Sequence, residues 1–123
     1  MFWFFRPPED WDEVCLTIST MRRLVRYRIL REGDRAVLSR TAGQTEETGF
    51  CRADEVLHLL RRCRVQRWDG FHGRPFPGLK DGTMFSFTAR LNGRTIHASG
   101  HQHFPPRFHQ FKEGIEQLSG EVL

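Results

Sequence analysis

The stretch TMFSFTARLNGRTIHASG, residues 83–100, decides the fold of this chain. Apolar and polar residues alternate on both sides of Asn92-Gly93, which is the pattern of two strands that each bury one face. A two-residue hairpin turn with positive φ at both positions favours Asn-Gly. On the second strand, Ile96 and Ala98 share the apolar face. We therefore predict a β-hairpin over 83–100.

The same alternation occurs nearer the start of the chain. Residues 14–19 and 25–29 are predicted to be strands, and 35–41 returns after a Glu-Gly-Asp turn as the partner of the second. The next segment, 42–49, is polar and flanked by glycine, so we expect an exposed loop there. The aromatic run at 2–5 is a candidate edge strand.

Two segments have the periodicity of helices with one apolar face. In 52–63 the apolar residues follow i, i+1, i+3, i+4 and i+7 spacing, and acidic residues precede arginines as the helix dipole favours. Pro105-Pro106 suits the start of a last helix. Apolar residues then recur there at spacings of three and four: Phe108, Phe111, Ile115 and Leu118. Between the helices, 69–82 holds four glycines and two prolines, which predicts an irregular connection.

This order of strands, helix, strands and helix predicts an α+β fold. We expect an antiparallel sheet of about four to six strands, built from hairpins, with the two helices packed on one face. A length of 123 residues fits one domain, so 1–123 is interpreted as a single domain.

The composition indicates a folded protein and argues against several classes. Charged residues make up 28% of the chain, as in ordinary globular domains. Three cysteines without a CxxC pair favour neither a disulfide framework nor a thiolate zinc site. The apolar run at the start is too short for a secretory signal, and no segment approaches the roughly 20 apolar residues of a membrane span. We expect a cytoplasmic protein with no membrane contact and no cofactor.

Four of the six histidines lie within 97–111, which raises the question of a metal site. His101 and His103 have a spacing that can bind zinc when a strand places both on one face. A glycine before them and a proline after them predict a five-residue turn instead. His109 falls on the flank of the last helix, and His97 is expected to face solvent. Solvated turn histidines are the favoured interpretation, and a metal site of His101, His103 and His109 stays an alternative.

The segment 67–118 also resembles a pattern found in many small uncharacterised bacterial proteins of α+β architecture. The matching residues are Trp68, Asp81, Gly82, Phe85, Gly100, Phe104, Pro105, Phe108, Phe111 and Leu118. Those proteins usually carry asparagine or another small polar residue where Gln102 and His103 stand, so the histidines lie outside the resemblance. The resemblance implies a fold and no known activity.

Arginines give the chain a formal net charge of +4, which makes nucleic acid a candidate ligand. Arg26 and Arg28 are predicted to protrude from one face of a strand, with Arg22 and Arg23 near its start. On an exposed sheet face these four side chains could contact phosphates. The alternative is a sheet face that arginine keeps soluble.

An aromatic surplus favours a third class, protein–protein interaction. Successive side chains of a strand alternate between faces, so the run at 2–5 cannot point inward as a whole. The candidate interaction surface comprises Phe2, Trp3, Phe4, Phe5, Phe71 and Phe76. Some of this aromatic surface must be covered by the 69–82 loop, by a partner or by a second copy.

No residue pattern indicates an enzyme. The chain has no nucleophile elbow, phosphate loop or zinc-protease motif. Cys63 stands among arginines but falls on the apolar face of its helix, so we expect a buried structural thiol. The expected function is a non-enzymatic protein-interaction module or a homodimer, with nucleic-acid binding and metal binding as the alternatives.

Overall fold

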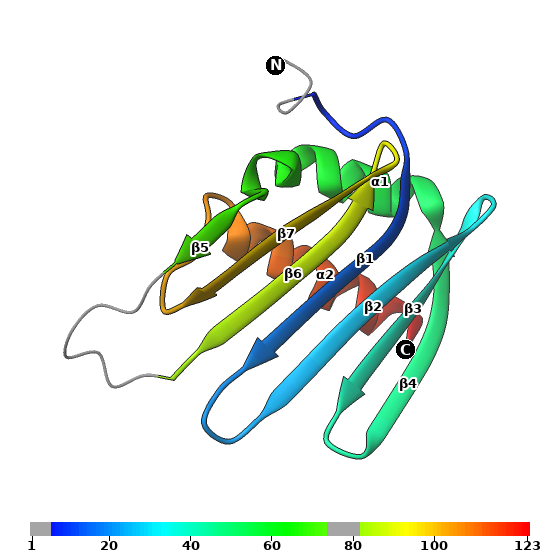
Figure 1. Cartoon of the computed structure of the whole chain (residues 1–123). Helices are drawn as coiled ribbons and strands as arrows, with labels where there is room; N and C mark the ends of the chain where they lie inside the picture. The colour runs from blue at the N-terminus through cyan, green and yellow to red at the C-terminus, as the bar shows by residue number, and fades with distance from the viewer. Residues whose placement is uncertain (1–5, 74–81) are drawn as a thin grey trace.

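The computed structural model describes residues 6–73 and 82–123. Within these ranges the chain forms one twisted sheet and two α-helices (Figure 1). The elements in chain order are β1 (Trp11–Ser19), β2 (Leu24–Glu32), β3 (Arg35–Ala42), β4 (Thr45–Arg52), α1 (Ala53–Arg62), the short 3-10 helix η2 (Val65–Trp68), β5 (Phe71–Gly73), β6 (Met84–Leu91), β7 (Arg94–His101) and α2 (Phe108–Val122). The predicted α+β class is confirmed.

Within the described residues the sheet has seven strands in the order β4-β3-β2-β1-β6-β7-β5. All neighbours are antiparallel except β5 and β7, which are parallel. The predicted number of four to six strands was therefore too low. The two elements that the alternation pattern missed are the two strands at the edges of the sheet, β4 and β5.

The loop predicted for 42–49 is wrong, because most of it is β4. The chain reverses at Gly43, which has a φ of +62°, and then pairs with β3 along the length of both strands. The position of β4 that faces the helices beside Leu38 is Gly49. A side chain there would collide with the backbone oxygen of Val122 in α2. Close packing against a helix thus removes the apolar residue that would have revealed the strand.

The irregular connection predicted for 69–82 begins with regular structure. Phe71–Gly73 forms β5 and pairs with Ala98–Gly100 of β7. Three residues are too few for an alternation pattern to be read from sequence. The remainder of this connection, 74–81, lies outside the described residues.

The Asn92-Gly93 hairpin is confirmed. Asn92 has a φ of 53° and Gly93 a φ of 74°, as a turn with two left-handed residues requires. On β6 the residues Phe85, Phe87, Ala89 and Leu91 are buried, and on β7 the buried residues are Ile96 and Ala98. The hairpin therefore buries the apolar face that the alternation predicted.

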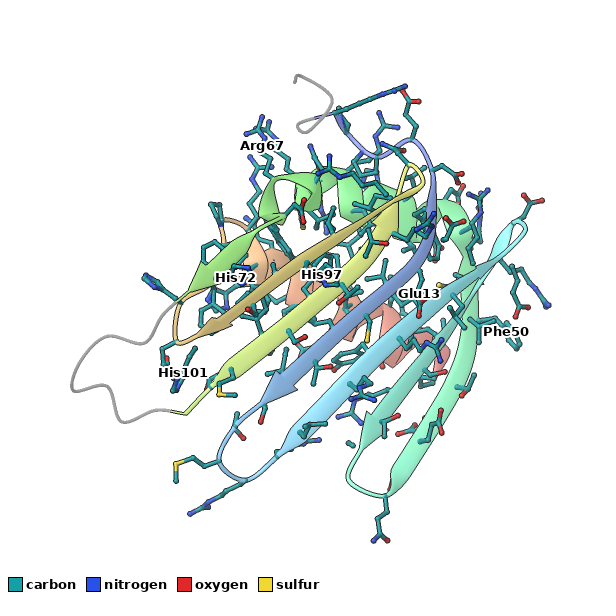
Figure 2. All side chains as sticks on the ribbon, in the orientation of Figure 1. Glu13, Phe50, Arg67, His72, His97 and His101 are labelled. Atoms are coloured by element: carbon teal, nitrogen blue, oxygen red, sulfur yellow. The ribbon has the colours of Figure 1, made fainter. Side chains whose placement is uncertain are left out.

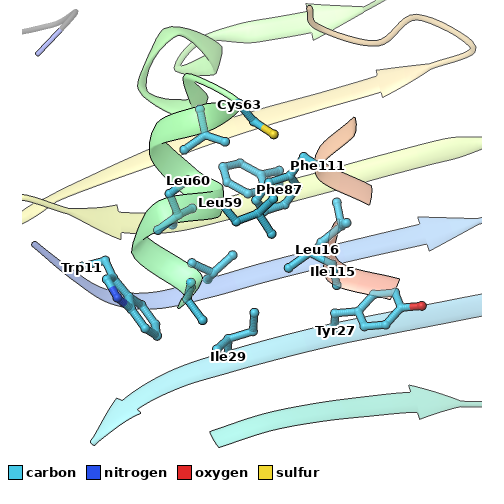
Figure 3. Close-up of a cluster of buried hydrophobic side chains, with 14 of the residues drawn as sticks. Trp11, Leu16, Tyr27, Ile29, Leu59, Leu60, Cys63, Phe87, Phe111 and Ile115 are labelled. Carbon is cyan, nitrogen blue, oxygen red and sulfur yellow. The ribbon is translucent and has the colours of Figure 1, made fainter. Parts of the chain in front are cut away.

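Aromatic rings join the sheet to the helical layer. The ring of Phe87 in β6 makes edge-on contacts with two other rings. Its centre lies 4.9 Å from that of Trp68 and 5.5 Å from that of Phe111 in α2. The indole Nε1 of Trp68 donates a hydrogen bond of 3.0 Å to the carbonyl oxygen of Pro106. Figure 1 shows α1 and α2 behind the sheet. Figure 3 shows buried side chains of the strands and helices in one cluster, including Leu60 of α1.

Candidate interaction surface

The sheet has a second face, which we call the open face. It carries the strand residues that alternate with the buried ones, so its composition follows from the two-residue period of a strand. In the described strands the open face comprises Glu13, Cys15, Thr17, Ser19, Leu24, Arg26, Arg28, Leu30, Glu32, Arg35, Val37, Ser39, Thr41, Glu46, Thr48, Phe50, Arg52, His72, Met84, Ser86, Thr88, Arg90, Thr95, His97, Ser99 and His101. Serine and threonine are the most frequent residues on this surface, followed by arginine.

The hydroxyl groups form cross-strand pairs along this face. Ser39 and Thr48 approach with their oxygens 3.4 Å apart, and the Thr88 hydroxyl lies 3.5 Å from Nδ1 of His97. His72 of β5 contacts Ser99 through Nδ1 at 3.1 Å. These pairs satisfy small polar groups across neighbouring strands.

The four arginines of the proposed nucleic-acid strip do not share one surface. Arg26 and Arg28 lie on the open face, and Nε of Arg28 donates a hydrogen bond of 3.0 Å to a carboxylate oxygen of Glu13. Arg22 and Arg23 are exposed in the connection between β1 and β2. Arg23 lines a cavity of about 180 Å³ whose other residues include Lys112 and Glu116 of α2. The four arginines are therefore divided between the open face and the β1–β2 connection, from which Arg23 reaches the helix side.

The candidate metal ligands are also separated. His101 is the last residue of β7, so the predicted five-residue turn begins later than expected. His103 lies beyond it, with its backbone against Gly100. His109 contacts the Phe104 ring at 5.2 Å beside the helix layer. Within 6–73 and 82–123 no group of three or more His, Cys, Asp or Glu side chains could hold a metal ion. Figure 2 labels His72, His97 and His101 along the edge formed by β5 and β7.

Most of the aromatic interaction surface expected from sequence falls outside the described residues. This applies to Phe2, Trp3, Phe4, Phe5 and Phe76. The remaining member, Phe71, is half-buried and packs with its ring 6.3 Å from that of Phe85. Phe71 therefore extends the core instead of offering a free aromatic surface.

The cysteine environments indicate low reactivity in two of three cases. Cys63 is buried, as expected from its helical phase, and burial raises the pKa of its thiol. Burial, followed by the charge of Glu55, raises the pKa of Cys51 to about 11. Little of the nucleophilic thiolate therefore exists at Cys51 at neutral pH.

Two ion pairs lie at the surface near the start of α1. A cavity of about 380 Å³ lies at this end of the sheet, lined by residues that include Asp10, Arg31, Arg52 and Asp54. Arg31 pairs with Asp10, and Arg52 pairs with Asp54 at 2.8 Å. Both arginines of the lining are therefore paired with acids, and the lining also contains the acids Glu9 and Asp34.

The feature that sequence reasoning missed is the β4 edge. Phe50 is 52% exposed there, and the Arg35 guanidinium lies 4.6 Å from the centre of its ring. Val37 of β3 lies opposite Phe50, and Leu30 of β2 lies opposite Val37; both are half-buried. We call this apolar row of three side chains the Phe50 strip. The sequence signal of the β3–β4 hairpin is Gly43, which lies two residues before the segment that begins at Thr45.

None of the helices in the described part of the chain is long and apolar enough to cross a membrane. No protein-family model, curated protein or solved structure matches the chain. The resemblance of segment 67–118 to small bacterial proteins thus stands on its residue pattern alone, and the surface must be interpreted from its own geometry.

Proposed function

We propose that this protein is a non-enzymatic protein-interaction module that binds an extended polypeptide segment along the outer edge of β4. The observation that carries the proposal is the position of this strand. An eight-residue strand has β3 on one side and no described strand on the other. Such an edge presents backbone N–H and C=O groups that can pair with another chain.

The hairpin register indicates which backbone groups point away from β3. Ala42 and Thr45 flank the two-residue loop between β3 and β4. Residues that flank such a loop exchange hydrogen bonds, and hydrogen-bonded pairs then alternate along an antiparallel ladder. Thr45 and every second residue after it are therefore satisfied by β3. The outward-pointing residues are Glu46, Thr48, Phe50 and Arg52.

The side chains beside the edge supply apolar contact area. Phe50 and its strip lie on the open face, next to the position that an added strand would take. In strand addition the backbone bonds contribute affinity, whereas alternate side chains contribute specificity. The proposal assumes that both helices pack on the same face of the sheet. A strand bound at the edge of β4 would then add its side chains to the opposite, open face.

The opposite edge supports this choice by contrast. β5 has three residues, and short edge strands are one way in which proteins limit unwanted pairing. β4 is more than twice as long and lies flush with β3. Of the two edges in the described sheet, β4 is the better template for another strand.

Nucleic-acid binding has less support from the open face. Arg28 is paired with Glu13, and Nε of Arg90 lies 3.6 Å from a carboxylate oxygen of Asp12. Apart from histidine, Phe50 is the one aromatic side chain on this face in the described strands, whereas single-stranded nucleic acids stack on several rings. We expect the protein to elute from heparin at low salt, and retention at high salt would favour the nucleic-acid alternative.

Binding of extended peptides tests the proposal directly. Peptides that bind the intact protein can be selected from a random display library. In NMR spectra, these peptides should shift the amide resonances of β4. Thr48→Pro removes one outward N–H without removing a bond to β3, so it should abolish peptide binding. Thr48→Ala keeps the N–H and serves as the matched control. Peptides that map elsewhere, or that bind the proline variant equally well, would refute the proposal.

A further inference from the structure

We infer that the strand that pairs with β4 is β4 of a second copy of this chain, arranged antiparallel about a two-fold axis at Gly49. The inference rests on the proposed function, because it takes the β4 edge as the binding surface. It adds the identity of the partner and the register of the pair. The evidence lies in the charges, the hydrogen-bonding groups and the apolar side chains of this edge.

The charges along β4 are complementary to themselves. On the open face the strand carries an acid at one end, Glu46, and a base at the other, Arg52. Gly49 is midway between them. A two-fold rotation about Gly49 places each Glu46 directly opposite the Arg52 of the other copy. Opposite charges at directly opposed cross-strand positions stabilise a sheet, and the symmetry produces two such pairs.

The backbone groups agree with this register. Pairing Glu46 with Arg52 and Thr48 with Phe50 brings together only residues whose N–H and C=O groups point outward. If the register shifted by one residue, residues whose N–H and C=O groups point outward would lie opposite residues whose groups point toward β3. A shift by two residues keeps the bonds but places Glu46 opposite Phe50, or Phe50 opposite itself. Among registers that can form the ladder, this one alone pairs the charges.

The isolated chain also contains a like-charge pair that the second copy would neutralise. Arg35 and Arg52 are directly opposed on the β3–β4 hairpin, an arrangement that destabilises a sheet. In the paired edge, the second copy's Glu46 lies on the other side of Arg52. The ion pair that Arg52 makes with Asp54 is solvent-exposed, with side chains 74% and 63% accessible, so it holds Arg52 only weakly.

The exposed aromatic ring gains cover in the same arrangement. Phe50 lies opposite Thr48 of the other copy, and the two Phe50 side chains become diagonal neighbours across the axis. Diagonal positions are about 7–8 Å apart at their Cα atoms, within reach of aromatic rings. The Phe50 strips of both copies then meet as one apolar row, which removes exposed apolar area from water.

On the helix side of the strand, Glu47 would face Cys51 of the other copy, and its carboxylate already lies 4.0 Å from the guanidinium of Arg40. Within the two strands, no acid therefore faces another acid. The last turn of α2 lies over Gly49, so the Val122 backbones of the two copies would come close to the two-fold axis on this side. A single strand pair is small beside specific interfaces, which bury roughly 1,200 Å² or more, so we expect a dimer that dissociates on dilution.

Charge reversal tests the pairing. Sedimentation equilibrium of the full chain over a concentration series should show a monomer–dimer equilibrium. Glu46→Arg and Arg52→Glu should each raise the dissociation constant about tenfold or more, because two attractive pairs become repulsive. An equimolar mixture of the two variants should form heterodimers, in which both pairs are again attractive. Glu113→Arg and Arg67→Glu make the same charge changes away from β4 and should leave the equilibrium unchanged.

Cross-linking tests the register. Thr48→Cys mixed with Phe50→Cys should give a disulfide-linked heterodimer, because directly opposed residues of a hydrogen-bonded pair have suitable Cα separations of about 5.5 Å. Each cysteine variant alone should cross-link poorly. Efficient self-linking of either variant would place the axis elsewhere and overturn the register.

Other outcomes would overturn the inference as a whole. A strict monomer at every concentration would refute self-pairing, as would a dimer that both charge reversals leave intact. Near-ultraviolet circular dichroism establishes that each variant is folded. The two proposals fail separately, because a monomer that still binds selected peptides at β4 keeps the proposed function and loses the homodimer.

Discussion

The two faces of the sheet are built from the same strands and differ in burial. Along β6, Phe87 is 1% exposed on the helix side, whereas its neighbour Thr88 contacts His97 on the open face. Met84, which also lies on the open face, is 46% exposed. The burial of apolar area, which dominates stability, is therefore concentrated on one face. The other face and its β4 edge can carry binding groups at little cost to the fold.

The largest expected effect comes from truncating two consecutive residues of β6, one on each face of the sheet. Phe87→Ala should lower the free energy of unfolding by about 3–5 kcal/mol, because it leaves a cavity beside Trp68 and Phe111. Thr88→Ala should change it by roughly 0.5 kcal/mol or less. Urea denaturation of both variants measures these values. Equal losses would show that the open face also contributes to the core.

Two glycines of α2 refine the comparison within the helical layer. A side chain at Gly114 would collide with Leu59 of α1, so Gly114→Ala should cost about 1–3 kcal/mol, partly offset by the helix propensity of alanine. A side chain at Gly120 meets no atom within 4 Å, and Gly120→Ala should stabilise the protein by about 0.5–1 kcal/mol. Thermal melting distinguishes the two signs. Stabilisation by both variants would mean that α1 and α2 pack less closely than described.

Cysteine alkylation probes the two faces without changing the sequence. Cys51 lies on the helix side with a pKa raised to about 11 by burial and by Glu55, whereas Cys15 lies on the open face. Iodoacetamide at pH 8 should modify Cys15 before Cys51. The rate at Cys51 should rise by about tenfold per pH unit toward pH 10, because only the thiolate reacts. Mass spectrometry of the labelled peptides follows both rates, and equal labelling at pH 8 would contradict the raised pKa of Cys51.

The elements predicted from sequence are those whose local pattern coincides with their burial. The hairpin at Asn92-Gly93 carries both an alternating pattern and a turn type that few sequences support. Helix α1 carries an apolar stripe with charges ordered along its dipole. β4 was missed because one position that faces the helices is a glycine, Gly49, and its remaining residues are mostly polar. β5 was missed because it is a three-residue strand held by a distant partner.

The candidate surface was less predictable than the fold. Adjacent positions in sequence suggested one cluster of arginines and one of histidines. The folded chain separates Arg23 from Arg26, and His109 from His101, because a turn or a helix start redirects the chain between them. The β4 edge is visible only when the order of the strands is known.

The sequence by itself determined the α+β class, the central hairpin and the periodicity of both helices, since these depend on neighbouring residues and on the two repeat lengths of secondary structure. The tertiary structure alone decided the order of seven strands, the parallel pairing of β5 and the position of β4 at an edge. These features depend on contacts between residues distant in the chain, which local periodicity does not encode. The charge order from Glu46 to Arg52 acquired a meaning only when that edge was defined.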